Sequence, residues 1–376
     1  MTDGLLVSYL LIGMFAAVTA YVSTPIVRWC ARRAGAIDRP SDRKVHAHPT
    51  PTLGGTALFI AVFIAGVIAS NMPEFSDVFT TTSEPLAMAG AAVVIFGLGF
   101  IDDLRPLPAP VKLAVQIFAA GILFLAGVKM QYVLLPNQEY VFISDDVSVL
   151  VTVGWLVATM NAVNLVDGLD GLAAGIVAIA STSFFVYTFL LTQESDFPVI
   201  TAAPLASIAV AGACLGFLRH NFYPAKIFMG DSGSLLLGLL LGAATISGIG
   251  QTPFSDESSS AAVFLAYFSL LIPLLVLAIP ILDAVFAVLR RARHRRSLFH
   301  ADKEHLHHRL MDLGHGHRQA VIVMYIWSAL AAGAGLAFTF LDRDNVVFAL
   351  PVAVGAIVLY TLFPVLTKFV QRSLEP

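Results

Sequence analysis

The sequence is poor in charged residues and in cysteine. Charged side chains make up 12% of its 376 residues, about half the share found in a typical soluble domain, which argues against a soluble globular fold. The two cysteines, Cys30 and Cys214, provide neither a disulfide framework nor the spacing of a zinc site. No lysine or arginine precedes Arg28, so the basic start of a cleavable signal peptide is missing. We therefore expect the first apolar run, Leu5 to Val27, to stay in the protein.

Long hydrophobic runs fill most of the chain. Hydrophobic residues account for 57% of it, and the mean hydropathy is +0.82. A membrane-spanning helix needs about 20 apolar residues, and eleven candidate stretches are present: 5–28, 53–70, 85–101, 111–128, 148–163, 172–191, 200–218, 233–250, 262–289, 320–341 and 346–367. We predict an all-α, polytopic integral membrane protein of about eleven transmembrane helices, in which residues 1–376 form a single domain.

The polar breaks between these runs alternate in charge. Of the 22 lysines and arginines, 20 fall in one set of breaks, and only Lys129 and Arg343 fall in the other. Basic residues concentrate on the cytoplasmic side of membrane proteins. The pattern therefore predicts a multi-pass protein of the plasma membrane with its N-terminus outside and its C-terminus in the cytoplasm. Carboxylates, amides and histidines gather in the same basic breaks, which indicates an active site on the cytoplasmic face.

A pair of adjacent carboxylates, Asp102 and Asp103, follows the third apolar run. On a helix they would point about 100° apart, so both can face one cavity. Repulsion between like charges this close raises the pKa of one of the two carboxyl groups, which suits a general base. Acidic residues are unfavourable at a helix C-terminus, so we expect a compensating cation or a function. Lys112 is a candidate to pair with them or to bind a phosphate. A solvated helix end is the alternative.

A second motif places a polar side chain at every third position. Its members are Asn161, Asn164, Asp167 and Asp170, with glycines after each of the two aspartates. This spacing makes a slowly turning polar stripe that leaves the fifth predicted helix. Such hard oxygen donors suit Mg²⁺ or the polar groups of a nucleotide, although the full EF-hand pattern is missing. A capped turn between two helices is the alternative.

The third motif, Gly230-Asp231-Ser232-Gly233, opens the eighth predicted helix. Asp231 or Ser232 can cap that helix, and the free N–H groups at its start form an anion site. A carboxylate beside such a site can hold a cation that bridges to a bound phosphate. A plain N-cap with glycine is the alternative.

Two basic loops carry further candidates. After the ninth run, a histidine series follows an arginine cluster: His305, His307, His308 and Arg309. Zinc is one interpretation of this series, but a pyrophosphate bound through imidazole and Arg309 is at least as good. In the loop before the second run, Lys44 can contact phosphate, although a loop that only sets the topology explains it as well.

The chain resembles the polyprenyl-phosphate N-acetylhexosamine-1-phosphate transferase superfamily, glycosyltransferase family 4. Four motifs, in this order, carry the resemblance: Asp102-Asp103, 161–171, 229–233 and 305–309. In the last loop, the branch that transfers phospho-MurNAc-pentapeptide usually has three consecutive histidines, whereas this chain has His305-Leu306-His307-His308. That loop is similar to the bacterial WecA-type branch, which takes UDP-GlcNAc.

The resemblance implies a Mg²⁺-dependent phosphoglycosyltransferase of the bacterial inner membrane. It would transfer N-acetylglucosamine-1-phosphate from UDP-GlcNAc to undecaprenyl or decaprenyl phosphate and release UMP. The product would be the lipid-linked precursor that starts cell-envelope polysaccharide synthesis. Mg²⁺, or Mn²⁺ in its place, would neutralise the diphosphate, with Asp231 as the first ligand and Asn164 or Asp167 assisting.

The implied roles of the other residues follow the motifs. Asp102 or Asp103 would deprotonate or orient the lipid phosphate for direct attack, and a covalent aspartyl-phosphate is the rival route. The expected catalytic residues are Asp102, Asp103, Lys112 and His308. The expected substrate-binding residues are Lys44, Asn161, Asn164, Asp167, Asp170, His305, His307 and Arg309.

Two other functions stay open at this stage. The first is the same chemistry with another donor, UDP-MurNAc-pentapeptide or a different UDP-HexNAc. The second is an ion-coupled transporter that uses Asp102, Asp167, Asp231 and Asp283 as ion sites, but no inverted halves are found and the carboxylates lie at one membrane face. Membrane lipid is an expected partner, nucleic acid is not, and a homodimer is left open.

Overall fold

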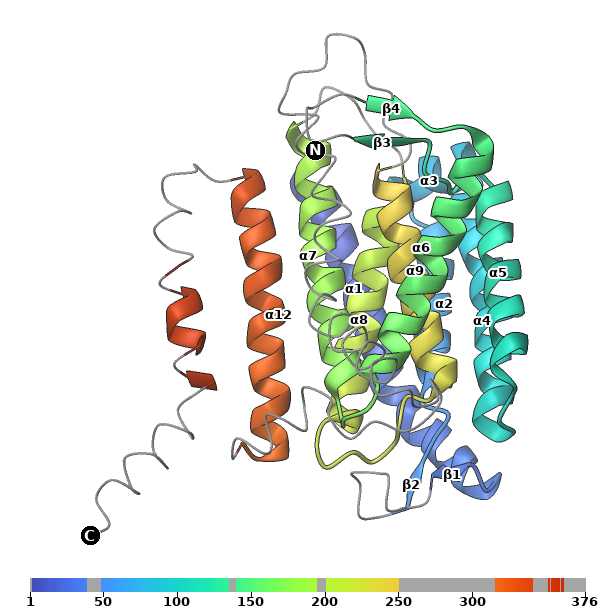
Figure 1. The fold of residues 1–376 in the computed structure, drawn as a ribbon, viewed down its shortest axis with the longest axis vertical. Helices are drawn as coiled ribbons and strands as arrows, with labels where there is room; N and C mark the ends of the chain where they lie inside the picture. The colour runs from blue at the N-terminus through green and yellow to red at the C-terminus, as the bar shows by residue number, and fades with distance from the viewer. Residues whose placement is uncertain are drawn as a thin grey trace, which may run out of the picture.

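The computed structural model describes residues 2–38, 49–134, 140–194, 201–249, 315–340, 351, 353–358 and 360–361. These ranges consist mainly of α-helices (Figure 1). The helices are α1 (Thr2–Arg33), α2 (Gly55–Ser70), α3 (Ser76–Thr81), α4 (Glu84–Leu104), α5 (Ala109–Leu125), α6 (Asp145–Val166), α7 (Leu172–Glu194), α8 (Ala203–Asn221), α9 (Asp231–Ile249) and α12 (His317–Phe340). A 3₁₀-helix, η1 (Pro73–Phe75), precedes α3.

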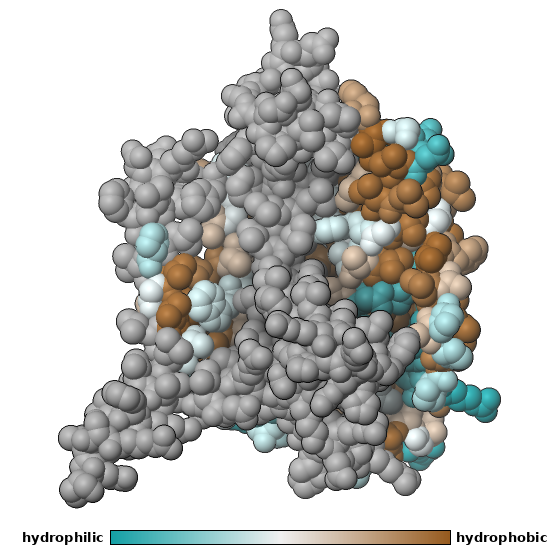
Figure 2. Space-filling view, viewed as in Figure 1, coloured by the Kyte–Doolittle hydropathy of each residue, from teal (hydrophilic) through white to brown (hydrophobic). Residues whose placement is uncertain are grey.

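Seven of the described helices are long and apolar enough to cross a membrane. Helix α2 and the segment Pro73–Thr81 meet at a bend of 94°, and they give an eighth span if they are counted as one. Helix α5 is apolar but shorter. The long helices run side by side in Figure 1, and Figure 2 shows broad hydrophobic areas among the described side chains. The prediction of a helical, multi-pass membrane protein is confirmed. The predicted span 262–289 and most of 346–367 lie outside the described residues.

Two short strand pairs depart from the all-α prediction. Strand β1 (Ile37–Asp38) pairs antiparallel with β2 (Thr50–Pro51), and β3 (Tyr132–Leu134) pairs with β4 (Tyr140–Phe142). The first pair lies at the end of the bundle where α1 ends, and the second lies at the opposite end (Figure 1). Strands of two or three residues are too short for an alternating apolar pattern to be recognised in the sequence, which is why the prediction missed them.

Helix α9 is the most enclosed of the spans. Of an 18-residue stretch within it, 94% is buried, and it packs against α2, α4, α6 and α8. Glycines permit this close packing, because a Cβ at Gly55 of α2 or at Gly99 of α4 would collide with the backbone at Ser232. The N-terminus of α9 is therefore held tightly against the start of α2 and the end of α4.

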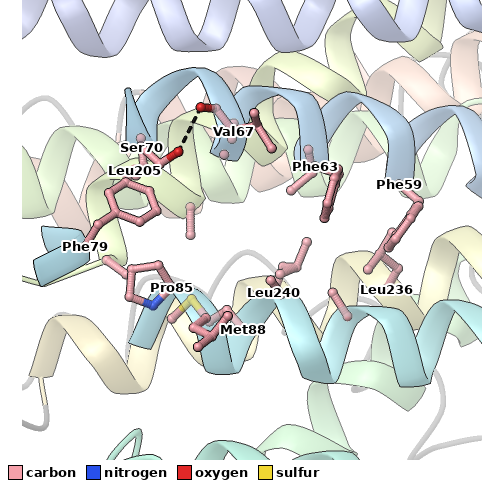
Figure 3. Close-up of a pocket in the computed structure, with 18 residues that line it drawn as sticks. Phe59, Phe63, Val67, Ser70, Phe79, Pro85, Met88, Leu205, Leu236 and Leu240 are labelled. Carbon is pink, nitrogen blue, oxygen red and sulfur yellow. Dashed lines mark hydrogen bonds between the residues drawn. The ribbon is translucent and has the colours of Figure 1, made fainter. Parts of the chain in front are cut away.

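An apolar cavity of about 330 Å³ lies between α2, α4, α8 and α9. Figure 3 shows Phe59 and Phe63 of α2 on one side of the cavity, and Met88 of α4 with Leu236 and Leu240 of α9 on the other side. The α4 residues in its wall belong to the first three turns of that helix. The cavity therefore begins more than one helical turn beyond the start of α9 and extends toward the opposite end of the bundle.

Candidate functional site

Asp103 binds the N-terminus of α9. Its Oδ1 accepts a hydrogen bond from the backbone N–H of Asp231 at 2.8 Å, and its Oδ2 accepts from the N–H and the hydroxyl of Ser232 at 3.2 and 2.6 Å. The first N–H groups of a helix attract an anion. The sequence predicts an anion-binding site at this helix terminus. In the structure the Asp103 carboxylate occupies that site, so a substrate phosphate has to be bound by other groups.

The residue before α9 must be a glycine for this contact to form. Gly230 has a φ of +73°, a backbone conformation that residues with a side chain rarely adopt. A Cβ at Gly230 would also collide with the carboxylate of Asp103. The glycine is thus required both for the turn and for the close approach of Asp103.

Lys112 is shared by two carboxylates. Its Nζ donates to Oδ2 of Asp102 at 2.7 Å and to Oδ2 of Asp231 at 2.9 Å. The second oxygen of Asp102 accepts from the backbone N–H of Leu107 at 2.7 Å, which fixes the carboxylate near the end of α4. The sequence predicts a cation for the aspartate pair, and Lys112 is confirmed as that cation. The side chains of Lys112 and Asp231 stay 28% and 27% exposed, so a ligand can reach both.

Asn164 completes the surroundings of Asp231. Its Nδ2 donates to Oδ1 of Asp231 and to Oγ of Ser234, both at 2.9 Å. One carboxylate therefore joins α9 to Lys112 of α5 and to Asn164 of α6. We call the group of Asp102, Asp103, Asp231, Lys112 and Asn164 the aspartate cluster. These five predicted site residues lie together at one end of the bundle.

A buried glutamine supports the aspartate cluster and was not predicted from the sequence. The exposed Asn161 donates from Nδ2 to Oε1 of Gln116 at 2.8 Å, and Gln116 is 2% exposed. Gln116 lies one helical turn after Lys112 on α5, and Asn161 lies one turn before Asn164 on α6. The two helices are thus tied together twice, once through Asp231 and once through this amide pair. The described hydrogen bonds of Asn161 are with α5 and α6, and its role in binding substrate stays a prediction.

The two remaining aspartates of the second motif differ in surroundings. Asp167 ends α6 and is half-buried. Burial raises the pKa of its carboxyl well above the ordinary value, and the charges of Asp231, Asp103 and Asp170 raise that pKa further. Asp170 accepts from the backbone N–H of Ala225 at 2.9 Å, so it anchors the loop between α8 and α9.

The start of α2 contacts the loop that precedes α9. The backbone N–H groups of Gly54 and Gly55 donate to the carbonyls of Phe228 and Met229 at 2.9 and 2.8 Å. The N–H of Phe228 donates in turn to the carbonyl of Pro51 at 2.8 Å. The sequence suggested no contact between these two loops, and this pairing brings the end of the first basic loop next to the aspartate cluster.

Comparison with known proteins identifies the family. The model of glycosyl transferase family 4 matches residues 85–249. The decaprenyl-phosphate N-acetylglucosaminephosphotransferase of Mycolicibacterium smegmatis is 39% identical over 370 residues, which cover 97% of this chain and 91% of the relative. The chain belongs to glycosyl transferase family 4. The resemblance predicted from the motifs is thereby confirmed.

Two other bacterial proteins are also similar to the chain. A probable undecaprenyl-phosphate N-acetylglucosaminyl 1-phosphate transferase of Bacillus subtilis is 36% identical over 326 residues, with 87% of this chain and 84% of the relative covered. An undecaprenyl-phosphate alpha-N-acetylglucosaminyl 1-phosphate transferase of Escherichia coli is 28% identical over 341 residues, with 88% and 84% covered. The residues matched by the family model include the whole aspartate cluster.

Several predicted site residues of this family member lie outside the described residues. They are Lys44, Asp283, His305, His307, His308 and Arg309. The expected phosphate-binding roles of the lysine, the histidines and the arginine stay predictions, as does the ion site that the transporter alternative places at Asp283.

The oxygen donors at the site fit a magnesium ion held jointly with a substrate. Among the described residues, no three His, Cys, Asp or Glu side chains form a metal-binding group. Mg²⁺, however, is commonly bound by one or two carboxylates together with water and substrate phosphates. Asp102 and Asp231 converge on one ammonium group, so the cluster already holds a positive charge between two carboxylates.

Proposed function

We propose that the protein transfers N-acetylglucosamine-1-phosphate from UDP-GlcNAc to a polyprenyl phosphate, undecaprenyl or decaprenyl, and releases UMP. The product is the lipid-linked precursor for a cell-envelope polysaccharide. The observation that carries the proposal is the sharing of Lys112 by Asp102 and Asp231 at one end of a bundle of membrane-spanning helices. The names of three relatives, each covered over 84% or more of its length, support the donor and the acceptor class.

The reaction needs positioned charges more than covalent chemistry. An oxygen of the lipid phosphate attacks the phosphorus attached to the sugar, a new P–O bond forms, and the bond between that phosphorus and the oxygen of UMP breaks. Phosphoryl transfer of this kind depends on orientation and on neutralising the oxygens of the phosphates. In our proposal, Lys112 binds these oxygens when substrate enters, and Asp102 orients the acceptor phosphate.

Asp103 has a different part in this proposal. Both of its oxygens are engaged by the start of α9, so its carboxylate positions Asp231 and does not attack phosphorus. This geometry favours direct attack over an aspartyl-phosphate on Asp103. Both oxygens of Asp102 are also bound, by Leu107 and Lys112, but the ammonium of Lys112 is partly exposed and a substrate phosphate can engage it instead. In our proposal Asp102 is therefore the carboxylate that meets the acceptor.

Magnesium is the proposed metal, with manganese as a substitute. Asp231 would hold it, and Asn164 and Asp167 would assist. When bound, the ion neutralises the diphosphate of the donor. Asp231 is suited to this role because its carboxylate lies at the mouth of the site and already interacts with a cation.

We propose that the aspartate cluster faces the cytoplasm from the bacterial inner membrane, in one domain of eleven spans with the N-terminus outside. The basic residues of the described helix ends support this orientation, because Arg32, Arg33, Lys112, Arg219 and Arg318 lie at the same end of the bundle as the aspartate cluster (Figure 1). Lys129 lies at the opposite end, where it pairs with Asp145 at 3.4 Å.

Radiolabel transfer by the purified protein tests the proposal. The assay contains Mg²⁺, a polyprenyl phosphate and either UDP-GlcNAc or UDP-MurNAc-pentapeptide, and follows UMP and the lipid product. We expect lipid-linked GlcNAc that disappears when EDTA removes the metal. Product from the pentapeptide donor alone would assign the protein to the peptidoglycan branch. No product from any UDP-sugar would refute the transferase and leave the transporter as the function to examine.

A further inference from the structure

A basic pocket lies at the same end of the bundle as the aspartate cluster. It has a volume of about 520 Å³ and is formed by the last turns of α8, the loop that follows α8 and the start of α12. Its lining consists of Leu215, Leu218, Arg219, Phe222, Tyr223, Pro224, Lys226 and Arg318. None of these residues belongs to the aspartate cluster, so the pocket is a separate site.

Three cations give the pocket its charge. Arg219, Lys226 and Arg318 are all exposed, and the described lining residues include no carboxylate. Within the described ranges no aspartate or glutamate forms an ion pair with any of the three. Asp170 lies close to this loop, because it accepts from the N–H of Ala225, but it forms no ion pair with these cations among the described residues. A cluster of three cations attracts an anion, and an arginine fork is well shaped to bind phosphate oxygens.

The pocket is also built to hold one of these cations in place. Nε of Arg318 donates to the carbonyl of Tyr223 at 3.1 Å, and its guanidinium lies 5.8 Å from the centre of the Tyr223 ring. The Tyr223 ring also stacks on His317, with the ring centres 4.3 Å apart. Only one edge of the Arg318 guanidinium is used by these contacts, so its remaining N–H groups can meet a ligand.

An apolar surface continues from the cations along α8. Leu215 is 56% exposed, and Leu218 lies one turn closer to the end of the helix, next to Phe222 in the pocket wall. A ligand that fits both parts has an anionic head and a hydrocarbon tail. A phospholipid of the surrounding leaflet has this chemistry, whereas a soluble phosphate uses only the cations.

We propose that this pocket binds the phosphate group of an anionic phospholipid, with an acyl chain lying along Leu215 and Leu218. Basic pockets between transmembrane helices at the cytoplasmic face are known to hold acidic head groups, and each nearby Lys or Arg contributes roughly a fivefold gain in binding. The lipid would join α8 to α12, two helices that are far apart in the sequence.

Binding of defined lipids to the intact protein in detergent tests the proposal. Native mass spectrometry would follow titrations with dioleoyl phosphatidylglycerol, with dioleoyl phosphatidylcholine and with inorganic phosphate. We expect one phosphatidylglycerol to bind at least roughly fivefold more tightly than phosphatidylcholine. Phosphate at millimolar concentration should fail to displace it, because phosphate lacks the acyl contacts.

The variants are Arg219→Gln with Lys226→Gln, and Arg318→Gln separately. Each change should remove most of the preference for phosphatidylglycerol. Arg32→Gln is the matched control, because it removes one exposed cation from the same end of the bundle outside the pocket. Size-exclusion elution would check folding, and Arg318→Lys should restore part of the preference.

Three results would overturn the proposal. One is a preference that survives in both pocket variants. Another is an equal loss in Arg32→Gln, which would assign the effect to overall charge. The last is displacement of the lipid by inorganic phosphate alone, which would make the pocket a site for soluble anions.

Discussion

Gly230→Ala is expected to destabilise the start of α9 strongly. An alanine at φ +73° costs about 1–2 kcal/mol. Its Cβ would also collide with the Asp103 carboxylate, which must then move and weaken at least one of its hydrogen bonds to Asp231 and Ser232. A hydrogen bond to a charged group contributes about 1.5–3 kcal/mol. The expected total is a loss of about 2.5–5 kcal/mol in the free energy of unfolding.

Gly97→Ala is the matched control. Gly97 lies within α4, and a Cβ added there meets nothing within 4 Å, so the change should be neutral or stabilise the helix by about 0.5–1 kcal/mol. Thermal unfolding in detergent, followed by the fluorescence of the three tryptophans, compares the variants. We expect Gly230→Ala to lower Tm by roughly 5 °C or more and to abolish transfer activity. Equal Tm values for the two variants would refute the reasoning.

Three further substitutions test the site and the fold. Gln116→Leu should lower kcat at least about tenfold with little change in KM, because Lys112 and its partners lose their support while the substrate contacts remain. If Tm and activity fell together and Gln116→Asn restored neither, Gln116 would have only a structural role. Asp231→Asn should abolish metal-dependent turnover, whereas Asp145→Asn at the opposite end should not; near-normal turnover in the first would refute the ligand assignment. His308→Ala should cut transfer activity strongly; a change in zinc content alone would contradict its role with phosphate.

The end of the bundle opposite the aspartate cluster offers a test that is independent of catalysis. Glu84 is 1% exposed and accepts from the N–H of Ala202 at 2.9 Å and from the hydroxyl of Ser247 at 2.6 Å. Glu84→Ala would leave these buried donors unpaired, which costs about 1–3 kcal/mol each. We expect a clear fall in Tm with transfer activity retained below the new Tm. An unchanged Tm would show that water replaces the carboxylate.

Much of the site could be predicted from local patterns. Asp102 and Asp103 stand out because carboxylates are unfavourable at the end of an apolar helix, and the three-residue spacing of Asn161, Asn164 and Asp167 is visible along the chain. Gln116 carried no such signal, since a single amide inside an apolar run resembles many buried residues. Its importance appears only from its bond to Asn161, 45 positions away.

The sequence by itself determined that the chain crosses a membrane, because the length and polarity of a run decide whether it spans a bilayer. It also determined which polar residues are grouped at one end, since the positive-inside pattern follows the order of the runs. Only the tertiary structure decided which partner each of those residues contacts. Asp103 meets the start of α9 across 128 positions, and Lys112 meets Asp231 across 119. Such pairings depend on which helices pack together, and the close packing of α9 against α2 and α4 through their glycines is a property of shapes in contact that no single segment encodes.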